Sequence, residues 1–237
     1  MFKKERKENY HHIEVEQNPN SQVSHAVQKF AVNLEFLNVD RTYKVLQVTS
    51  TLPSEGKTTL VGNLAYLLAQ KGYKTLIIDL DLRKPKVNRI FDKPNVGGLT
   101  KFLIEKAKKE DVIIKTDKGI DFIPTGQISG SVAAILESQK LFDLVEELKK
   151  EYDYILLDTP PMQVNADALM ASKLACGVLY VVGHNLVKKN VIKESVNTLR
   201  RRNVPVLGII LTQVKMPKRG NYYYYYYYHK DNVDWYS

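Results

Sequence analysis

The sequence predicts an α/β fold in which helices cover a mainly parallel β-sheet, as a single domain with a flexible tail at each end. Apolar runs of strand length alternate with segments whose apolar residues recur every three or four positions, an order typical of parallel α/β sheets. The 237 residues, 44% of them hydrophobic, suit one domain better than two. A third observation also favours this fold class: a glycine-containing loop joins the first predicted strand to the next predicted helix.

The individual elements follow from the same patterns. Strand-like apolar runs occupy residues 44–50, 74–79, 120–124, 153–158, 177–182 and 206–211. Helical spacing of apolar residues occurs over residues 24–37, 57–71, 139–151, 165–174 and 188–202. We therefore expect a folded domain over residues 22–214, an N-terminal tail of residues 1–21 and a C-terminal tail of residues 215–237.

Composition and charge indicate the compartment and exclude several partners. Cys176 is the only cysteine, so an internal disulfide is impossible and the reducing cytoplasm is the simplest compartment. No apolar run approaches the roughly 20 residues that span a bilayer, and no apolar region of a secretory signal follows the charged residues 1–7. The basic clusters behind the net charge of +9 are scattered. We therefore expect no nucleic-acid partner and favour attraction to an anionic inner membrane face.

The strongest chemical signal is the segment over residues 50–59, between a predicted strand and a predicted helix. In a phosphate-binding loop, backbone amides wrap the phosphates, a lysine (here Lys57) reaches their outer oxygens, and the next hydroxyl (Thr58) binds Mg²⁺. Thr51 replaces the first glycine of the general motif, so the loop is a variant, and a coincidental turn is the alternative. We expect the nucleotide contacts to be Pro53, Ser54, Glu55, Gly56, Lys57, Thr58 and Thr59.

Two aspartates at the end of the next strand, Asp79 and Asp81, form a second signal. In an extended chain, residues two apart project to the same side, so both carboxylates can enter one cleft, roughly 6 to 7 Å apart. The cleft would lie at the carboxyl edge of the sheet, where open α/β folds bind ligands. Carboxylates there suit Mg²⁺ binding and proton abstraction. Solvated loop acids, or a strand-end salt bridge with Arg83, are the alternative.

A third acid, Asp158, ends a buried strand that leads into Pro160 and Pro161. In phosphate-loop enzymes an acid at this place holds the Mg²⁺ that bridges the nucleotide phosphates. A cap on the turn before the prolines is the alternative. Because the three motifs come in the order and spacing of a nucleotide site, we expect ATP and Mg²⁺ bound to a phosphate-loop NTPase domain.

Residues 222–228 are seven consecutive tyrosines. A folded core has no use for such a run, because a strand would place alternate rings on opposite faces and a helix would ring its circumference with them. We therefore expect an exposed tail. A low-complexity sticky tail or a buried strand edge is the alternative, but beside a phosphate-transferring site the phenol hydroxyls become candidate acceptors.

Together these motifs resemble the bacterial tyrosine kinases of capsule and exopolysaccharide synthesis. The resemblance rests on residues 53–59 as Walker A, residues 77–85 as the family's additional Asp-x-Asp-x-Arg motif, residues 155–161 as Walker B, and the tyrosine cluster. It spans about residues 24–237. ATPases of the Min and Par partitioning class share the variant loop and the fold, but lack the tyrosine tail and this acidic motif.

The resemblance implies an ATP-dependent kinase whose subunits phosphorylate one another's tails. It makes Lys57 the phosphate clamp, Thr58 a Mg²⁺ ligand and Asp79 the base for the tyrosine proton, with Asp81 and Asp158 holding the metal. A phenol with a pKa of about 10 does need a nearby carboxylate, although spacing leaves open which of Asp79 and Asp81 is the base. The implied acceptors are Tyr222, Tyr223, Tyr224, Tyr225, Tyr226, Tyr227 and Tyr228, with Tyr236 a further candidate.

The resemblance also implies partners. These are a transmembrane activator, or polysaccharide co-polymerase, that holds the chain at the inner face of the membrane, a tyrosine phosphatase, and further copies of the chain. Family members usually carry Glu-x-x-Arg-x-x-Arg on the first helix for packing into a ring. His25, Gln28 and Ala31 stand at these positions here, which puts the ring in question. The family's proline-rich stretch before Walker B is replaced by residues 129–134.

The leading hypothesis is therefore an ATP-dependent protein-tyrosine kinase that phosphorylates its own tyrosine cluster and regulates capsular or exopolysaccharide synthesis. The alternative is a positioning ATPase of the Min and Par type, which would release phosphate without modifying tyrosine. A scaffold with a degenerate nucleotide site is a third class, disfavoured because the lysine, the threonine and the three aspartates are all present.

Overall fold

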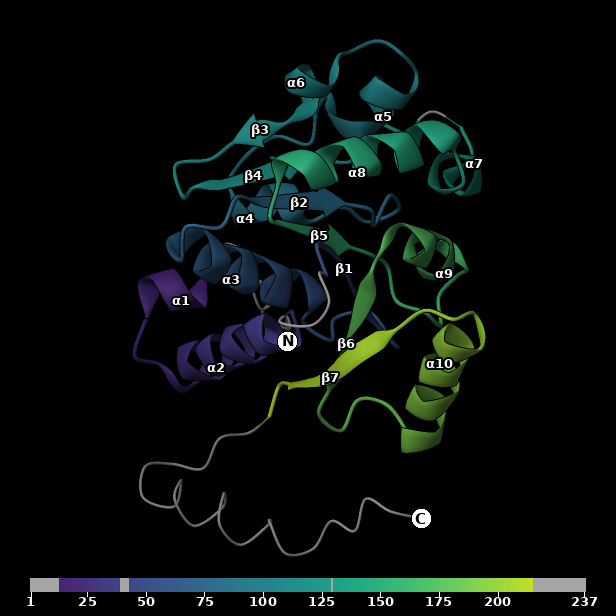
Figure 1. Cartoon of the computed structure of the whole chain (residues 1–237). Helices are drawn as coiled ribbons and strands as arrows, with labels where there is room; N and C mark the ends of the chain where they lie inside the picture. The colour runs from purple at the N-terminus through teal and green to yellow at the C-terminus, as the bar shows by residue number, and fades with distance from the viewer. Residues whose placement is uncertain (1–12, 39–42, 129, 215–237) are drawn as a thin grey trace, which may run out of the picture.

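The computed structural model describes residues 13–38, 43–128 and 130–214. In these residues the chain forms a seven-stranded sheet of order β3-β4-β2-β5-β1-β6-β7 (Figure 1). All neighbouring strands are parallel except β3 and β4. The predicted α/β class with a mainly parallel sheet is confirmed. The strands are β1 (Val45–Ser50), β2 (Thr75–Asp79), β3 (Ile114–Lys115), β4 (Ile120–Ile123), β5 (Tyr154–Asp158), β6 (Gly177–Gly183) and β7 (Val206–Thr212).

Alternate residues of the central strands pack into two apolar layers, because side chains along a strand point to opposite faces of the sheet. In β1, Leu46 and Val48 join one layer, whereas Val45 joins the other. Every residue of β1, β2, β5 and β6 is buried. Continuous apolar runs therefore form strands that are covered on both faces, as expected for a parallel sheet.

Helices cover each layer of the sheet (Figure 1). The layer around Leu46 is covered by α1 (Glu14–Gln17), α2 (Gln22–Leu37), α3 (Lys57–Gln70) and α4 (Val87–Ile90). The layer around Val45 is covered by α5 (Gly98–Leu103), α6 (Lys109–Val112), α7 (Val132–Leu136), α8 (Gln139–Glu151), α9 (Asp167–Ala171) and the 3₁₀ turn η1 (Ser172–Leu174). On β6, Val178 and Tyr180 pack against α10 (Lys189–Arg201).

Serine caps fix where several of these helices begin. The side chains of Ser21, Ser131 and Ser138 accept hydrogen bonds from backbone amides three residues further on, at the starts of α2, α7 and α8. The leucines and valine of α8 that enter the core are three or four residues apart, at positions 141, 144, 145 and 148. The local sequence therefore determines both the start of α8 and its buried face.

The segment before α2 belongs to the folded core, and its prediction as part of a tail of residues 1–21 is corrected from Ile13 onward. Ile13 is 2% exposed and Val15 is 4% exposed. The backbone N–H of Val15 donates a hydrogen bond of 3.0 Å to Oδ1 of Asn63 on α3. A single buried turn is too short to show a helical period, so the pattern did not reveal it. The folded domain therefore includes residues from Ile13 onward.

Two further stretches differ from expectation. Residues 165–174, predicted as one helix, form the separate elements α9 and η1. Between β2 and β4, where no elements were predicted, the chain forms α4, α5, α6 and β3. The helices in this stretch are only four to six residues long, and Gly97 and Gly98, at the start of α5, have φ of 71° and 66°. Elements this short carry too few residues for a periodic signal.

The parallel arrangement determines where a ligand site can form. Because β2, β5 and β1 are adjacent and parallel, their carboxyl ends meet at one edge of the sheet. Among the helices of the described residues, none has the length and apolar character needed to cross a membrane. The predicted C-terminal tail, with its tyrosines, lies outside the described residues.

Candidate functional site

The chain between β1 and α3 turns through two left-handed residues. Ser54 has φ of 63°, and Gly56, the residue before α3, has φ of 91°. Thr51, which replaces the first glycine of the general motif, is buried, and its hydroxyl hydrogen-bonds with the Tyr180 hydroxyl at 3.0 Å. The side chain of Thr51 therefore anchors the loop to β6, a contact that glycine could not make.

Glu55 is a second anchor inside the loop. Its side chain is fully buried, and Oε2 accepts a hydrogen bond of 2.6 Å from the backbone N–H of Leu52. The other oxygen, Oε1, accepts one of 2.9 Å from the N–H of Gly183 at the end of β6. Because both oxygens are used within the protein, the Glu55 carboxylate holds the loop shape.

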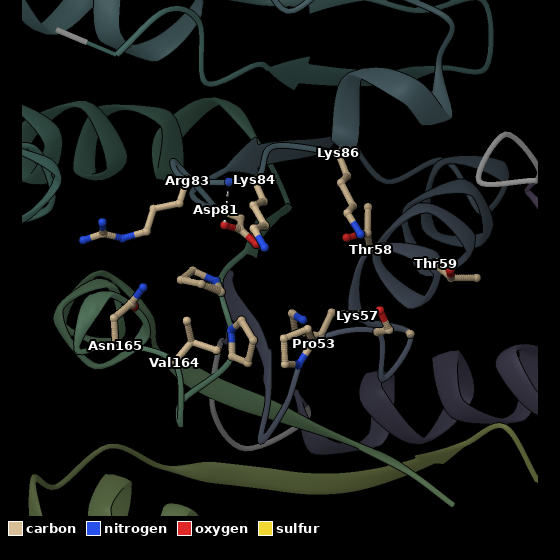
Figure 2. A pocket seen from close by; sticks show the side chains of 14 residues that line it. Pro53, Lys57, Thr58, Thr59, Asp81, Arg83, Lys84, Lys86, Val164 and Asn165 are labelled. Atoms are coloured by element: carbon tan, nitrogen blue, oxygen red, sulfur yellow. Dashed lines mark hydrogen bonds between the residues drawn. The ribbon is translucent and has the colours of Figure 1, made fainter. Parts of the chain in front are cut away.

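A cavity of about 120 Å³ lies at the carboxyl edge of the sheet (Figure 2). Asp81 and six of the seven predicted nucleotide contacts line it: Pro53, Ser54, Gly56, Lys57, Thr58 and Thr59. The seventh, Glu55, does not. Seven further lining residues were not assigned from the sequence: Arg83, Lys84, Lys86, Pro160, Pro161, Val164 and Asn165. They lie in the loops that follow β2 and β5. Because both strands end at this edge of the sheet, the position of these loops in the sequence was the signal that could have identified them.

Lys57 is the first residue of α3 and is only 8% exposed. Burial lowers the pKa of its ammonium group, and the nearby Asp158, Asp81 and Glu55 carboxylates partly offset that effect. A buried cation at the amino-terminal end of a helix is unfavourable in isolation, since that end already carries partial positive charge. The arrangement suits a bound anion such as a phosphate.

Thr58 and Asp158 join α3 to the end of β5. The Thr58 hydroxyl donates a hydrogen bond of 2.7 Å from Oγ1 to Oδ2 of Asp158. The other carboxylate oxygen, Oδ1, is buried and has no hydrogen-bond partner among the described residues. Burial raises the pKa of Asp158 to about 6, although Lys57 and the Thr58 hydroxyl oppose the shift. An unpaired, buried carboxylate oxygen fits a site for a cation.

Asp79 lies behind the cavity wall. It is fully buried, and its Oδ2 accepts hydrogen bonds of 3.0 Å from the backbone amides of Lys86 and Val87. Its Oδ1 accepts one of 3.2 Å from the amide of Asp81. Burial, followed by the proximity of Asp158, raises the pKa of Asp79 well above its usual value. The Asp79 carboxylate therefore organises the loop that follows β2.

Asp81 lines the cavity, unlike Asp79. Asp81 therefore meets the prediction that the carboxylates enter one cleft, and for Asp79 it stays a prediction. The Leu80 amide donates to the Asp158 carbonyl at 2.8 Å, which continues the pairing of β2 with β5 by one hydrogen bond beyond Asp79. Burial raises the pKa of Asp81. Arg83 is paired with Asp167, at 2.6 Å, rather than with either acid of the motif.

The donor set at this edge fits a magnesium ion held together with a nucleotide. Within the described residues, no three His, Cys, Asp or Glu side chains form a group that could hold a metal by themselves. Mg²⁺ in nucleotide sites is usually bound through one or two protein oxygens, phosphates and water. The Thr58 hydroxyl and the unpaired oxygen of Asp158 match that role, with Asp81 nearby on the wall.

The remaining predicted sites lie away from the cavity or outside the described residues. His25 and Gln28 are exposed on α2, whereas Ala31 is fully buried. The third position of the ring-packing motif therefore faces the core in this chain. The candidate acceptors Tyr222–Tyr228 and Tyr236 are not among the described residues, so their role stays a prediction.

Sequence comparison connects this geometry to known proteins. Residues 43–179 match the model of a family described as an AAA domain. The chain is 35% identical over 205 residues to tyrosine-protein kinase YwqD of Bacillus subtilis, covering 86% of each chain. It is 32% identical over 209 residues to the putative tyrosine-protein kinase CapB of Staphylococcus aureus, covering 88% of this chain and 92% of that one.

Solved structures agree with the sequence relatives. The chimerical protein CapA2B2 superposes with a TM-score of 0.81 at 32% identity, covering 87% of this chain and 90% of that one. The kinase domain of the Escherichia coli tyrosine kinase ETK gives 0.80 at 26% identity, covering 89% and 85%. The septum site-determining protein MinD of Pyrococcus horikoshii gives only 0.61 at 25% identity, covering 71% and 69%. The chain therefore belongs to the bacterial tyrosine kinases and is a protein-tyrosine kinase built on a phosphate-loop NTPase fold.

Proposed function

We propose that this kinase uses ATP and Mg²⁺ to phosphorylate Tyr222–Tyr228 on a neighbouring copy of the chain, and thereby regulates capsular or exopolysaccharide synthesis. The observation that carries the proposal is the Thr58–Asp158 hydrogen bond beside the buried ammonium group of Lys57. These groups combine an anion site with a cation site at one edge of the sheet, which is what a metal-bound nucleoside triphosphate requires.

The loop and α3 provide the nucleotide half of the proposed site. Backbone amides of the loop and the amino-terminal end of α3 would bind the phosphates, and Lys57 would neutralise their outer oxygens. Thr58 and Asp158 would hold Mg²⁺ directly or through water, and a bound Mg²⁺ would supply further neutralisation of phosphate charge. Phosphoryl transfer depends mainly on such positioning and charge neutralisation.

In the proposed site, the hydroxyl of the tyrosine that accepts the phosphate would lie next to Asp81. As the tyrosine oxygen bonds to the terminal phosphorus and the bond to ADP breaks, the phenol proton must pass to a base. Asp81 is the carboxylate on the cavity wall, so we assign this role to Asp81 and a positioning role to Asp79. Pro160, Pro161 and Val164 line the same cavity and offer apolar surface for the phenol ring.

The proposal also includes assembly of the chain at the membrane. Transfer between copies requires two chains to meet, so we propose a homo-oligomer held at the inner face of the cell membrane by a transmembrane activator. The overall charge of +9 favours an anionic membrane surface. A tyrosine phosphatase would reverse the modification. Because Ala31 is buried and an arginine is absent there, contacts other than the family's motif would have to stabilise any ring.

Mass spectrometry tests the proposal directly. After incubation with ATP and Mg²⁺, we expect phosphate on several tyrosines of residues 222–228. Lys57→Met should abolish the modification while leaving the thermal unfolding temperature close to that of the native chain, because the native lysine is a buried cation. Modification that persists in Lys57→Met would refute the assigned site.

A positioning ATPase is the second candidate function, because the fold also superposes on MinD with a TM-score of 0.61. In that case nucleotide turnover would change the association of two copies, and the tyrosines would only bind a partner. The kinase and the positioning ATPase differ in the product that they form from ATP. Release of inorganic phosphate with no phosphotyrosine, measured on the same sample, favours the positioning ATPase.

A further inference from the structure

The end of β7, the last strand before the tyrosine tail, is bonded to the phosphate-binding loop. Oγ1 of Thr212 donates a hydrogen bond of 2.6 Å to the backbone carbonyl of Glu55. Nε2 of Gln213 donates one of 2.6 Å to the carbonyl of Ser54. Two consecutive loop carbonyls are therefore held by two consecutive side chains at the end of the fold.

Backbone geometry gives these two bonds a consequence for the loop amides. In a trans peptide, the C=O of one residue and the N–H of the next point in opposite directions. When Gln213 and Thr212 hold the Ser54 and Glu55 carbonyls, the N–H groups of Glu55 and Gly56 point away from β7. Ser54 and Gly56 line the cavity, so the side chains of Thr212 and Gln213 set the direction of the donors that a phosphate would meet.

The residues that make these contacts have constrained backbones. Ser54 and Gln213, neither of them glycine, have φ of 63° and 56°, and Gly56 has φ of 91°. Such left-handed conformations persist in non-glycine residues when surrounding contacts hold them. A methyl group added at Gly56 would lie 3.5 Å from Cγ2 of Thr212, in van der Waals contact. The loop is therefore packed against β7 as well as bonded to it.

The position of β7 itself does not depend on these side-chain bonds. Thr212 pairs with Gly183 in the parallel register of β6 and β7, and its carbonyl accepts a hydrogen bond of 2.9 Å from the N–H of His184. Backbone contacts thus fix the strand end. The bonds from Thr212 and Gln213 to the loop are additional, and their removal should change the loop more than the sheet.

We infer that Thr212 and Gln213 are positioning residues for the phosphate-binding loop, and that they couple nucleotide binding to the end of the described fold. The tyrosine cluster begins at residue 222, nine positions after Gln213 in the sequence. A nucleotide that stabilises the loop amides in this orientation also stabilises the two bonds to β7, and by linkage an ordered end of β7 favours nucleotide binding. The coupling to phosphoacceptors rests on the proposed function, whereas the positioning role rests only on nucleotide binding.

A matched pair of substitutions tests the positioning role. Thr212→Val keeps the branched shape and removes the hydroxyl, and Thr212→Ser keeps the hydroxyl. Calorimetric titration with Mg²⁺ and a non-hydrolysable ATP analogue should show about tenfold weaker binding for Thr212→Val, equivalent to the loss of one well-placed hydrogen bond. Thr212→Ser should stay within about twofold of the native chain. Native affinity in Thr212→Val, or the same loss of affinity in Thr212→Val and Thr212→Ser, would overturn the inference.

Gln213→Ala keeps the test decisive if Thr212→Val does not fold. The side chain of Gln213 is exposed, so its truncation should leave the thermal unfolding temperature of the nucleotide-free protein unchanged while weakening binding about threefold or more. A purely structural role would instead lower the unfolding temperature and leave the affinity of the folded protein intact. Native affinity in Gln213→Ala would contradict the role assigned to this residue.

Amide hydrogen exchange tests the coupling. Addition of Mg²⁺ and the ATP analogue should slow exchange in a peptide covering residues 211–214 several-fold in the native chain and less in Gln213→Ala. Unchanged exchange in the native chain, at saturating analogue, would disprove the coupling. Absence of tyrosine phosphorylation alone would count against the proposed function only, because affinity and exchange are measured without any transfer.

Discussion

Oγ1 of Thr58 lies 2.7 Å from Oδ2 of Asp158 and connects the first turn of α3 to the carboxyl end of β5. The remaining oxygen of Asp158 is buried without a hydrogen-bond partner in the described part of the chain. One oxygen of the buried Asp158 carboxylate thus bonds to α3, and the other is left to bind a cation. The metal dependence of the enzyme should therefore be centred on Asp158.

Replacing Asp158 by Asn should remove most of the phosphotransfer activity. The amide retains the shape of the carboxylate but lacks the charge that attracts Mg²⁺, so we expect the initial rate of tyrosine phosphorylation to fall about 100-fold or more. The rate is measured with labelled ATP at saturating Mg²⁺. Asp143→Asn, at an exposed acid on α8, is the matched control and should leave the rate unchanged. A near-native rate in Asp158→Asn would exclude Asp158 as a metal ligand.

The raised pKa of Asp158 predicts how metal binding depends on pH. Since burial brings this pKa to about 6, a proton competes with the cation in acidic solution. The affinity for Mg²⁺ in the presence of an ATP analogue should rise between pH 5 and pH 7 and level off above it. Fluorescence titration at several pH values measures this. A flat profile below pH 6 would show that Asp158 is already ionised there.

The raised pKa of Asp158 has the opposite effect on stability, because it favours the folded protein at low pH. Because the folded-state pKa of Asp158 lies above its ordinary value of 3.8, the folded protein binds the proton more tightly than the unfolded chain. Its contribution to the free energy of unfolding is therefore greatest below about pH 4 and is lost as pH rises through 6. Urea unfolding of the metal-free protein at pH 5 and pH 7 should show a smaller decrease in Asp158→Asn than in the native chain.

Asp79 and Asp81 should differ when each is replaced by Ala. Asp79→Ala leaves three backbone amides without their acceptor, and we expect the free energy of unfolding to fall by about 2–4 kcal/mol. Asp81→Ala should cost less than about 1 kcal/mol but lower the rate of phosphotransfer about 100-fold. Urea unfolding and the initial rate measure the two effects. Equal losses of stability would contradict the assignment of separate roles.

The buried turn α1 should contribute to stability. Ile13 is 2% exposed within the main core layer, so Ile13→Ala should lower the free energy of unfolding by about 2–5 kcal/mol. Val23→Ala, at a side chain on α2 that is 48% exposed, is the control and should change it by less than about 0.5 kcal/mol. If both variants unfold at the native urea concentration, residues 13–17 do not belong to the stable core.

The sequence predicted the parts of the fold that leave a local signal. Continuous apolar runs located six of the seven strands, and β3, with only two residues, was too short to show one. The phosphate-binding loop was predictable because its residues are consecutive. The hydrogen bonds that hold the Asp79 carboxylate were not, because they come from the backbone amides of Lys86 and Val87 in the loop after β2, which leave no local signal. The bonds from Thr212 and Gln213 to the loop are long-range contacts between residues with no motif of their own.

Transfer between copies is the central claim, and a mixing experiment tests it most directly. One chain keeps Lys57 but has Phe at residues 222–228 and 236, so it can transfer phosphate and cannot accept it. The other is Lys57→Met with its tyrosines intact. With ATP, Mg²⁺ and membranes from the producing cells, we predict phosphotyrosine only on the Lys57→Met chain, only in the mixture, and faster at higher protein concentration. Phosphate release without phosphotyrosine on that chain would contradict the account.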